Sequence, residues 1–253
     1  FPGVRALIDA RFDLVAGEVH ALMGENGAGK STLMKVLAGV YSKDDGTIKV
    51  GGKEVEINGP RAAQALGIGI IHQELNLMNH LSVANNIFIG REPRNAFGVI
   101  DKPKMNKDTQ AILDRLHLKL APETLVSELT VAKQQMVEIA KALSFQGTRV
   151  LILDEPTNHL DIMAKEAVEA ALETFDGTVL LVTHDRYLVN EVAGRIWAVE
   201  KGHLTNYNGN YDFYLEERDK RQQREAPLPE SSHRAPKEEP VKPDGSKHRP
   251  HEE

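Results

Sequence analysis

The amino-acid sequence predicts an α/β fold with a mainly parallel β-sheet, and three observations lead to this prediction. Residues 150–154 (VLILD) form an aliphatic run that ends on an acid, which indicates a strand buried on both faces of a sheet. Residues 178–183 (TVLLVT) form a second buried run. Helical segments separate the predicted strands, and such alternation is typical of a parallel sheet.

The predicted elements begin with a strand, a glycine-rich loop and a helix. Residues 18–23 (EVHALM) fit a strand, GENGAGKS follows as the loop, and apolar residues within 32–40 recur at helical spacing. Residues 46–57 fit two short strands around Gly51-Gly52, which is a hairpin signal. A short helix is expected at residues 60–67, after a proline.

The rest of the chain contains a helical block, a further helix and a polar tail. A mostly helical block is expected at about residues 74–145. Residues 164–175 (AKEAVEAALETF) fit a helix that ends before Gly177. Residues 223–253 are rich in Pro, Glu, Lys, Ser and His and have little to bury, so we expect a disordered tail.

The composition limits the classes of function that the chain can serve. The 253 residues carry a net charge of -6, with 31 Lys and Arg against 37 Asp and Glu, so direct DNA binding is not expected. The absence of cysteine excludes disulfides and thiolate metal sites. No stretch approaches the roughly 20 apolar residues of a membrane helix, and we expect a cytoplasmic protein. Because the sequence starts at Phe1, we expect it to be trimmed at its start.

The segment GENGAGKS fits the phosphate-loop pattern through Gly24, Gly29, Lys30 and Ser31. It follows a strand and opens a helix, where backbone N–H groups can wrap phosphates and the helix N-terminus favours negative charge. We expect Lys30 to reach the β- and γ-phosphates and Ser31 to hold Mg²⁺. The alternative is a glycine-rich turn with a surface lysine.

Two adjacent acids, Asp154 and Glu155, follow the aliphatic run. If this strand lies beside the phosphate-loop strand, Asp154 ends near the metal, where a carboxylate can hold Mg²⁺ directly or through water. Glu155 can orient or deprotonate a water aimed at the γ-phosphate. The alternative is a solvated pair of acids at a strand end.

Together these motifs resemble those of the nucleotide-binding domain of ATP-binding cassette (ABC) proteins. GENGAGKS resembles Walker A, VLILDE resembles Walker B, and His184 after TVLLVT resembles the switch histidine. The resemblance implies a P-loop NTPase fold over residues 1–222, with a mainly parallel sheet core, an antiparallel β part and a helical subdomain. It also implies that the chain binds ATP and Mg²⁺ and hydrolyses ATP.

The resemblance assigns roles to further residues. Gln73, in IIHQE, corresponds to the Q-loop glutamine that contacts Mg²⁺, and it joins Lys30, Glu155 and His184 as a catalytic candidate. Phe1 lies roughly where the family has the aromatic that stacks on adenine. The other implied nucleotide contacts are Gly24, Asn26, Gly27, Gly29, Lys30, Ser31, Thr32, Thr130, Ala132 and Asp161, the last a D-loop residue at the dimer interface.

Four of these assignments also have purely structural explanations. Gln73 could be a polar surface residue and His184 a solvated residue at a strand end. Asp161 could N-cap a helix that begins near Ile162, and it could do both. Phe1 could be a frayed first residue.

The stretch LTVAK stands where the family has its signature LSGGQ, which caps the γ-phosphate of the opposite subunit. Thr130 keeps a hydroxyl, whereas Val131 and Ala132 replace the two glycines and Lys133 replaces the glutamine. A Cβ at Ala132 can clash with phosphate, or be tolerated if φ stays negative. Lys133 either adds charge toward the phosphate or is a solvated residue at a helix start. We expect slow turnover.

Two branches of the family resemble different parts of the chain. Residues 1 to about 148, including IIHQELNLM, resemble the first cassette of bacterial monosaccharide importers of the ribose, xylose or galactose type. Residues from about 150 to 220, beginning with LDEPTNHLD, resemble ABC-F proteins, which are translation factors that act on ribosomes.

The sequence is therefore consistent with three functions. The first is the ATPase subunit of a carbohydrate importer, which would work with membrane permease subunits at the inner face of the plasma membrane. The second is a ribosome-associated ABC-F factor. The third is a hybrid cassette that binds ATP without coupled function. Each would need a second nucleotide-binding domain, from a homodimer or a partner cassette, to complete the site.

Overall fold

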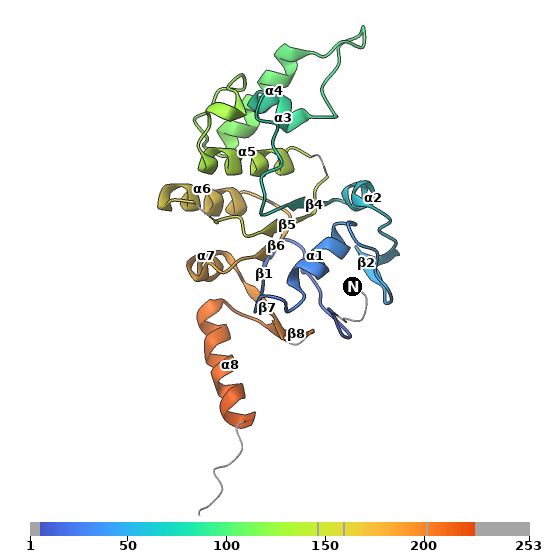
Figure 1. Cartoon of the computed structure of the whole chain (residues 1–253), viewed down its shortest axis with the longest axis vertical. Coiled ribbons are helices and arrows are strands. Elements are labelled where there is room, and N and C mark those ends of the chain that lie inside the picture. The colour runs from blue at the N-terminus through green and yellow to red at the C-terminus, as the bar shows by residue number, and fades with distance from the viewer. Residues whose placement is uncertain (1–5, 146, 159, 201, 226–253) are drawn as a thin grey trace, which may run out of the picture.

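The computed structural model describes residues 6–145, 147–158, 160–200 and 202–225 (Figure 1). A six-stranded sheet and a separate two-stranded hairpin contain the strands β1 (Val19–Gly24), β2 (Ile48–Val50), β3 (Lys53–Val55), β4 (Ile68–Ile71), β5 (Val150–Asp154), β6 (Thr178–Val182), β7 (Arg195–Glu200) and β8 (His203–Tyr207). The helices are α1 (Lys30–Leu37), α2 (Pro60–Ala65), α3 (Val83–Phe88), α4 (Lys102–Arg115), the 3-10 helix η1 (Val126–Glu128), α5 (Val131–Leu143), α6 (Ile162–Glu173), α7 (Arg186–Val192) and α8 (Tyr211–Glu225).

The large sheet is parallel except at one edge, which confirms the predicted α/β class. Its strand order is β4-β5-β6-β1-β7-β8, and only β8 pairs antiparallel with its neighbour. Strand β6 lies between β1 and β5 and pairs in parallel with both. The aliphatic strand at Val150–Asp154 is therefore not the direct neighbour of the phosphate-loop strand, contrary to the arrangement considered from the sequence. The carboxyl ends of all three strands still meet at one sheet edge.

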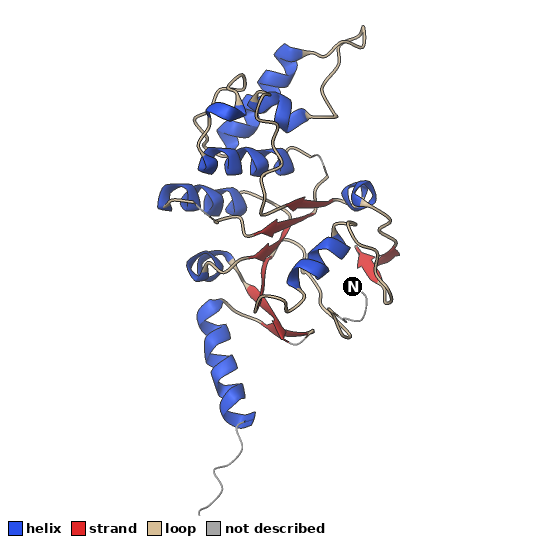
Figure 2. Ribbon diagram, viewed as in Figure 1, coloured by secondary structure: helices blue, strands red, loops and turns tan. Residues whose placement is uncertain are grey.

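Alternating side chains of the central strands pack into two hydrophobic cores, one on each face of the sheet. Leu151 and Leu153 belong to the core that includes residues of α3, α4, α5, α6, α7 and α8. Ile152 belongs to the other core, beneath α1, α2 and the hairpin. Figure 2 shows helices on both sides of the strands. Burial on both faces explains why β5 and β6 read as continuous apolar runs.

Local turn chemistry sets the hairpin and the start of α6. Gly51 and Gly52 have φ of 58° and 78°, and two successive positive φ values suit the tight turn between β2 and β3. Helix α6 begins at Ile162, and the Asp161 side chain caps it by accepting from the N–H of Ala164 at 2.8 Å, as the structural explanation of Asp161 predicts.

The block at about residues 74–145 contains α3, α4, η1 and α5 and forms the upper part of the molecule in Figure 1. The segment between α3 and α4 is a loop that extends away from the sheet (Figure 1). Residues 226–253, most of the segment expected to be a disordered tail, lie outside the described residues. Within the described part of the chain, no helix has the length and apolar character needed to span a bilayer.

Candidate functional site

The phosphate-loop segment connects the carboxyl end of β1 to the first turn of α1, as the sequence predicted. Gly24 and Gly29 have φ of 153° and 109°, which L side chains rarely adopt. A Cβ on Gly24 would lie 2.4 Å from the carbonyl oxygen of Val199, and one on Gly29 would lie 2.6 Å from that of Ala6. Both positions therefore need glycine for space as well as for backbone conformation.

Lys30 is held inside the loop that precedes it. Its Nζ donates to the carbonyl oxygens of Gly24 at 2.6 Å and Glu25 at 3.0 Å, and the residue is 8% exposed. Burial lowers the pKa of Lys30, while the nearby carboxylates of Glu155 and Asp154 act in the opposite direction. The two acids at the end of β5 thus lie within electrostatic reach of the lysine, despite the intervening strand.

Asp154 and Glu155 occupy different environments. Burial raises the pKa of Asp154, and the neighbouring Glu155 raises it further. His72, Lys35 and Lys30 partly offset this by favouring the charged carboxylate. His72 was not among the residues that the sequence singled out. It follows β4, which pairs in parallel with β5, so strand register brings it near Asp154.

Glu155 is held against His184 by its side chain and by its backbone. Its Oε2 accepts from the backbone N–H of His184 at 3.2 Å, and its Oε1 lies 3.4 Å from His184 Nε2. The N–H of Glu155 donates to the carbonyl oxygen of Val182 at 2.7 Å. Its φ of 49° is left-handed, a conformation that costs about 1–3 kcal/mol for a non-glycine residue. The sequence did not predict this strain, and the carboxylate lies beside His184, just beyond the end of β6.

The Glu155–His184 pair opens onto a cleft of about 490 Å³. Lys165 and Asp185 also line the cleft, where Lys165 Nζ lies 2.6 Å from Asp185 Oδ2. Asp185 N-caps α7 by accepting from the N–H of Leu188 at 3.3 Å. The wall of the cleft beside the catalytic candidates is therefore fixed by a cap and an ion pair.

Gln73 lies two residues beyond the end of β4 and is exposed. Both backbone polar groups of Asn76, which follows shortly after Gln73, form hydrogen bonds with side chains of α5. Glu138 Oε1 accepts from the N–H of Asn76 at 2.8 Å, and Lys141 Nζ donates to the carbonyl oxygen of Asn76 at 3.3 Å. Because α5 also begins with the signature segment, these contacts connect the segment after Gln73 to the helix that carries Thr130.

The signature segment lies away from the phosphate loop of the same chain. Thr130 N-caps α5 by accepting from the N–H of Lys133 at 3.4 Å, and Ala132 lies in the first turn without a positive φ. Figure 1 shows α5 in the upper helical layer and α1 on the other side of β4 and β5. The structure thus brings Lys30, Asp154, Glu155 and His184 to one sheet edge but does not bring Thr130 or Ala132 there.

The remaining predicted residues have simpler surroundings. Ser31 and Thr32 lie in the first turn of α1, and Asn26 and Gly27 are exposed in the loop before it. Asp161 N-caps α6, which confirms its structural explanation and leaves its proposed contact across a dimer untested. The proposed adenine contact at Phe1 lies outside the described residues.

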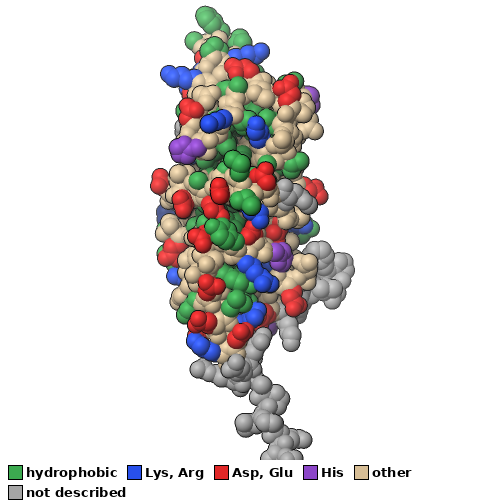
Figure 3. All heavy atoms as spheres, turned by 90° about the vertical axis from the view of Figure 1, so that its left-hand side faces the viewer, with side chains coloured by type: hydrophobic (Ala, Val, Ile, Leu, Met, Phe, Trp, Pro, Cys, Tyr) green, Lys and Arg blue, Asp and Glu red, His purple; other side chains and the backbone are tan. Residues whose placement is uncertain are grey.

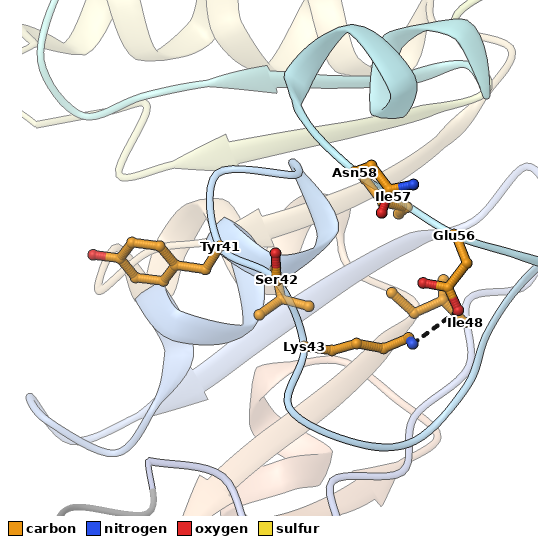
Figure 4. Close-up of a pocket in the computed structure, with 8 residues that line it drawn as sticks. Tyr41, Ser42, Lys43, Ile48, Glu56, Ile57 and Asn58 are labelled. Carbon is orange, nitrogen blue, oxygen red and sulfur yellow. Dashed lines mark hydrogen bonds and ion pairs between the residues drawn. The ribbon is translucent and has the colours of Figure 1, made fainter. Parts of the chain in front are cut away.

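A second hollow, of about 240 Å³, lies between the end of α1, the hairpin and the segment before α2 (Figure 4). Lys43 and Glu56 form an ion pair of 2.9 Å there, and Tyr41, Ser42 and Asn58 complete the polar lining (Figure 4). None of the residues predicted to contact nucleotide lines this hollow.

Known proteins resemble the chain in sequence. Residues 7–158 match the ABC transporter family. A relative from Burkholderia ambifaria, named ribose/galactose/methyl galactoside import ATP-binding protein 3, is 61% identical over 206 residues, which are 80% of this chain and 40% of the relative. A ribose/galactose/methyl galactoside import ATP-binding protein from Albidiferax ferrireducens is 54% identical over 206 residues, which are 80% of this chain and 41% of the relative. The chain thus spans about two fifths of the length of these relatives.

Solved structures share the fold at lower sequence identity. A nucleotide-free ATP-binding cassette from an ABC transporter has a TM-score of 0.71 at 22% identity, covering 85% of this chain and 90% of that one. Another such cassette, in an ADP conformation, has a TM-score of 0.74 at 21% identity, covering 85% and 89%. The family match contains both the phosphate loop and the acids that follow β5. The chain therefore belongs to the ABC transporter family and has the fold of its ATP-binding cassettes.

Proposed function

We propose that the chain binds ATP with Mg²⁺ and hydrolyses it as the cassette of a carbohydrate importer. The observation that supports ATP hydrolysis most directly is the meeting of Lys30, Asp154, Glu155 and His184 at the carboxyl edge of one parallel sheet. A buried lysine beside a glycine-rich helix start suits phosphate, and paired acids next to it suit a metal and a water.

The residues present fit a nucleotide and its metal. A Cβ on Gly27 would meet nothing within 4 Å, so the loop has open space beside it at this position. Lys30 could exchange its two carbonyl partners for phosphate oxygens without leaving the loop. The Ser31 hydroxyl and the Asp154 carboxylate would hold Mg²⁺, which offsets phosphate charge when bound, and Gln73 would approach it from β4.

Glu155 and His184 would position the attacking water. The Glu155 carboxylate would accept a hydrogen bond from a water aimed at the γ-phosphate and draw off its proton as the bond to phosphorus forms. The backbone N–H of His184 donates a hydrogen bond to that carboxylate, and the ring atom Nε2 of His184 lies next to its other oxygen. The γ-phosphate would leave ADP as inorganic phosphate, with Lys30 offsetting charge on the transferred group.

A second cassette would complete this site. Thr130 and Ala132 begin α5, on a different part of the chain from the phosphate loop, so a signature contact to nucleotide must come from another copy or a partner cassette. Asp161 and the exposed Ile162 beside it suit a place near that interface. Phe1 remains our candidate for stacking on adenine.

Carbohydrate import is proposed from the relatives. The relatives from Burkholderia ambifaria and Albidiferax ferrireducens are named for the import of ribose, galactose or methyl galactoside. We accordingly propose membrane permease subunits as partners, and a cytoplasmic location at the inner face of the membrane.

A ribosome-associated role is not favoured. The motifs predict importer resemblance only to about residue 148, yet importer relatives match over 206 residues. A match of that length must continue into the part that we compared with ABC-F proteins. The ABC-F resemblance therefore gains no support, and ribosomes are not a preferred partner.

Mg²⁺-dependent phosphate release from ATP by the purified chain tests the proposed activity. Lys30→Ala should weaken ATP binding. It should also slow phosphate release by roughly 10²–10³-fold, because it removes a cation from the transferred phosphate. Glu155→Gln should keep ATP binding but slow release by roughly 10²–10⁴-fold. Phosphate release that survives in Glu155→Gln would contradict the assigned role, and a wild-type chain that binds ATP without turnover would reduce the proposal to nucleotide binding.

A further inference from the structure

An apolar tip projects from the loop between α3 and α4. It consists of Phe97, Val99 and Ile100, which are 91%, 62% and 41% exposed. Figure 1 shows this loop at the extremity of the molecule opposite α8, and Figure 3 shows hydrophobic side chains at that extremity with Lys or Arg side chains close by. Three neighbouring apolar side chains at a projecting end indicate a surface that another apolar medium covers.

Hydrogen bonds hold the loop in one shape. Asn95 exchanges bonds with Val99, since its N–H donates to the Val99 carbonyl at 2.9 Å and its Oδ1 accepts from the Val99 N–H at 3.1 Å. The same Oδ1 accepts from the N–H of Phe97 at 3.0 Å. Arg94 Nη1 donates to the Gly98 carbonyl at 2.7 Å, and Gly98 has the positive φ of 77° that the turn needs. The tip is thus ordered before it meets a partner, which lowers the entropy cost of binding.

The surroundings of the tip are basic although the chain as a whole is acidic. Residues 91–108 contain five Lys or Arg and three Asp or Glu, against a net charge of -6 for the chain. Arg94, Lys102, Lys104 and Lys107 are exposed, and Lys104 also pairs with Asp108 at 2.9 Å. Apolar side chains flanked by cations match the layered chemistry of an anionic bilayer surface.

The size of the tip favours a bilayer over a protein partner. Only one of the three side chains is aromatic and the other two are partly covered, so the tip offers less than the roughly 600 Å² that each partner contributes to the smallest stable protein interfaces. A small wedge needs no matching pocket in lipid. We propose that the apolar tip inserts into the headgroup region of an anionic membrane, with Lys102 and Lys107 lying against the lipid phosphates.

This inference goes beyond ATP hydrolysis and does not depend on it. Co-sedimentation of the full chain with vesicles is measured without nucleotide, whereas the proposed activity is measured without vesicles. A variant with altered lipid binding and normal phosphate release would separate the two properties.

Vesicles of phosphatidylcholine with and without phosphatidylglycerol provide the test. The wild-type chain should bind those that contain phosphatidylglycerol, and the double variant Phe97→Ser, Val99→Ser should bind them roughly tenfold more weakly, because it loses the apolar insertion. Phe213→Ser, which changes an exposed aromatic in the first turn of α8, outside the helical block, is the matched control and should bind as the wild type does. Lys102→Gln with Lys107→Gln should reduce the preference for phosphatidylglycerol.

A fluorescence measurement distinguishes insertion from adsorption by charge alone. In Phe97→Trp, lipids with brominated acyl chains should quench the new tryptophan, while Trp197, which is 6% exposed, supplies a constant background. Absence of vesicle binding by the wild-type chain would overturn the proposal, as would equal binding by the wild type and the Phe97→Ser, Val99→Ser variant. Unquenched fluorescence from bound Phe97→Trp would overturn insertion.

Discussion

The phosphate loop and the signature segment both lead into a helix, but their helix ends differ. The N-cap of α1 is Gly29, with a φ of 109° and no side-chain cap. The N-cap of α5 is Thr130, whose hydroxyl accepts from the N–H of Lys133. A helix end without a side-chain cap offers its N–H groups to an anion, whereas the threonine cap already satisfies one donor.

This difference indicates that the two helix ends have different roles. The α1 end begins at Lys30, within electrostatic reach of the acids that follow β5, and this arrangement suits the phosphate binding that we propose. The α5 end lies in the helical layer, where its own cap stabilises the helix, and Glu138 and Lys141 further along α5 attach this helix to the segment after Gln73. It would reach a phosphate only on another cassette.

The largest expected effect comes from adding a Cβ at the cap of α1. Gly29→Ala would force alanine into a φ of 109° with its Cβ 2.6 Å from the Ala6 carbonyl oxygen. We expect a loss of about 1–3 kcal/mol in unfolding free energy and a loss of ATP binding. Gly27→Ala is the matched control, because its Cβ would meet nothing within 4 Å although its φ is also positive. Urea unfolding and ATP titration measure both, and equal effects at the two glycines would contradict the steric explanation.

The next effect concerns the attachment of α5 to the segment after Gln73. Glu138 is 9% exposed and accepts from the Asn76 N–H, so Glu138→Ala would leave that donor without its side-chain partner. We expect a loss of about 1–3 kcal/mol in unfolding free energy, measured by urea denaturation. Glu138→Gln keeps an acceptor oxygen and should lose less. If Glu138→Ala were as stable as the wild type, the hydrogen bond would not support the helical layer.

A smaller effect is expected at the cap of α5. Ala132→Gly would remove the methyl group that replaces a family glycine, at a helix cost of up to about 1 kcal/mol. We expect phosphate release to rise by roughly threefold, a barrier change of about 0.6 kcal/mol, because the backbone could approach a phosphate more closely. Steady-state phosphate release with a parallel unfolding curve measures this change, and a slower variant of unchanged stability would show that the methyl group does not hinder the reaction.

The smallest effect concerns a third helix end, that of α7, which Asp185 caps. Burial raises the pKa of Asp185, but the hydrogen bond from Lys165 and the N–H of Leu188 lower it more, so its pKa lies below the usual value. An acid with a depressed folded-state pKa stabilises the fold above its unfolded pKa, and this contribution is lost as pH falls through the folded pKa.

Lys165→Met tests that contribution and leaves the cap in place. We expect a loss of about 0.5–1 kcal/mol near neutral pH, since the pair is partly exposed. The difference from wild type should shrink as pH falls below about 3.9, the ordinary value for Asp. Urea unfolding at several pH values measures it, and a difference that does not depend on pH would assign the effect to packing instead of charge.

Local patterns in the sequence predicted most of the secondary structure that positions the site. The runs at 150–154 and 178–183 correspond to β5 and β6 because burial on both faces leaves little choice of residue. The glycine pair between β2 and β3 predicted a hairpin because both residues need positive φ. Asp161 was a recognisable helix cap from the sequence alone.

What the sequence did not predict depends on contacts between distant segments. Strand order placed β6 between β1 and β5, and no local pattern reports strand order. His72 approaches Asp154 only through the pairing of β4 with β5. The strained φ of Glu155 likewise occurs together with a hydrogen bond from its N–H to Val182 in another strand.

We expect one nucleotide site to combine the start of α1 from one cassette with the start of α5 from another. Mixing two inactive variants tests this expectation most directly. Lys30→Ala damages the phosphate loop, and Ala132→Asp places an acid at the signature; each should be nearly inactive alone while remaining folded. A mixed dimer pairs the intact loop of one copy with the intact signature of the other, so mixing should restore Mg²⁺-dependent phosphate release. A mixture no more active than the sum of its separate parts would contradict a site shared between two copies of this chain.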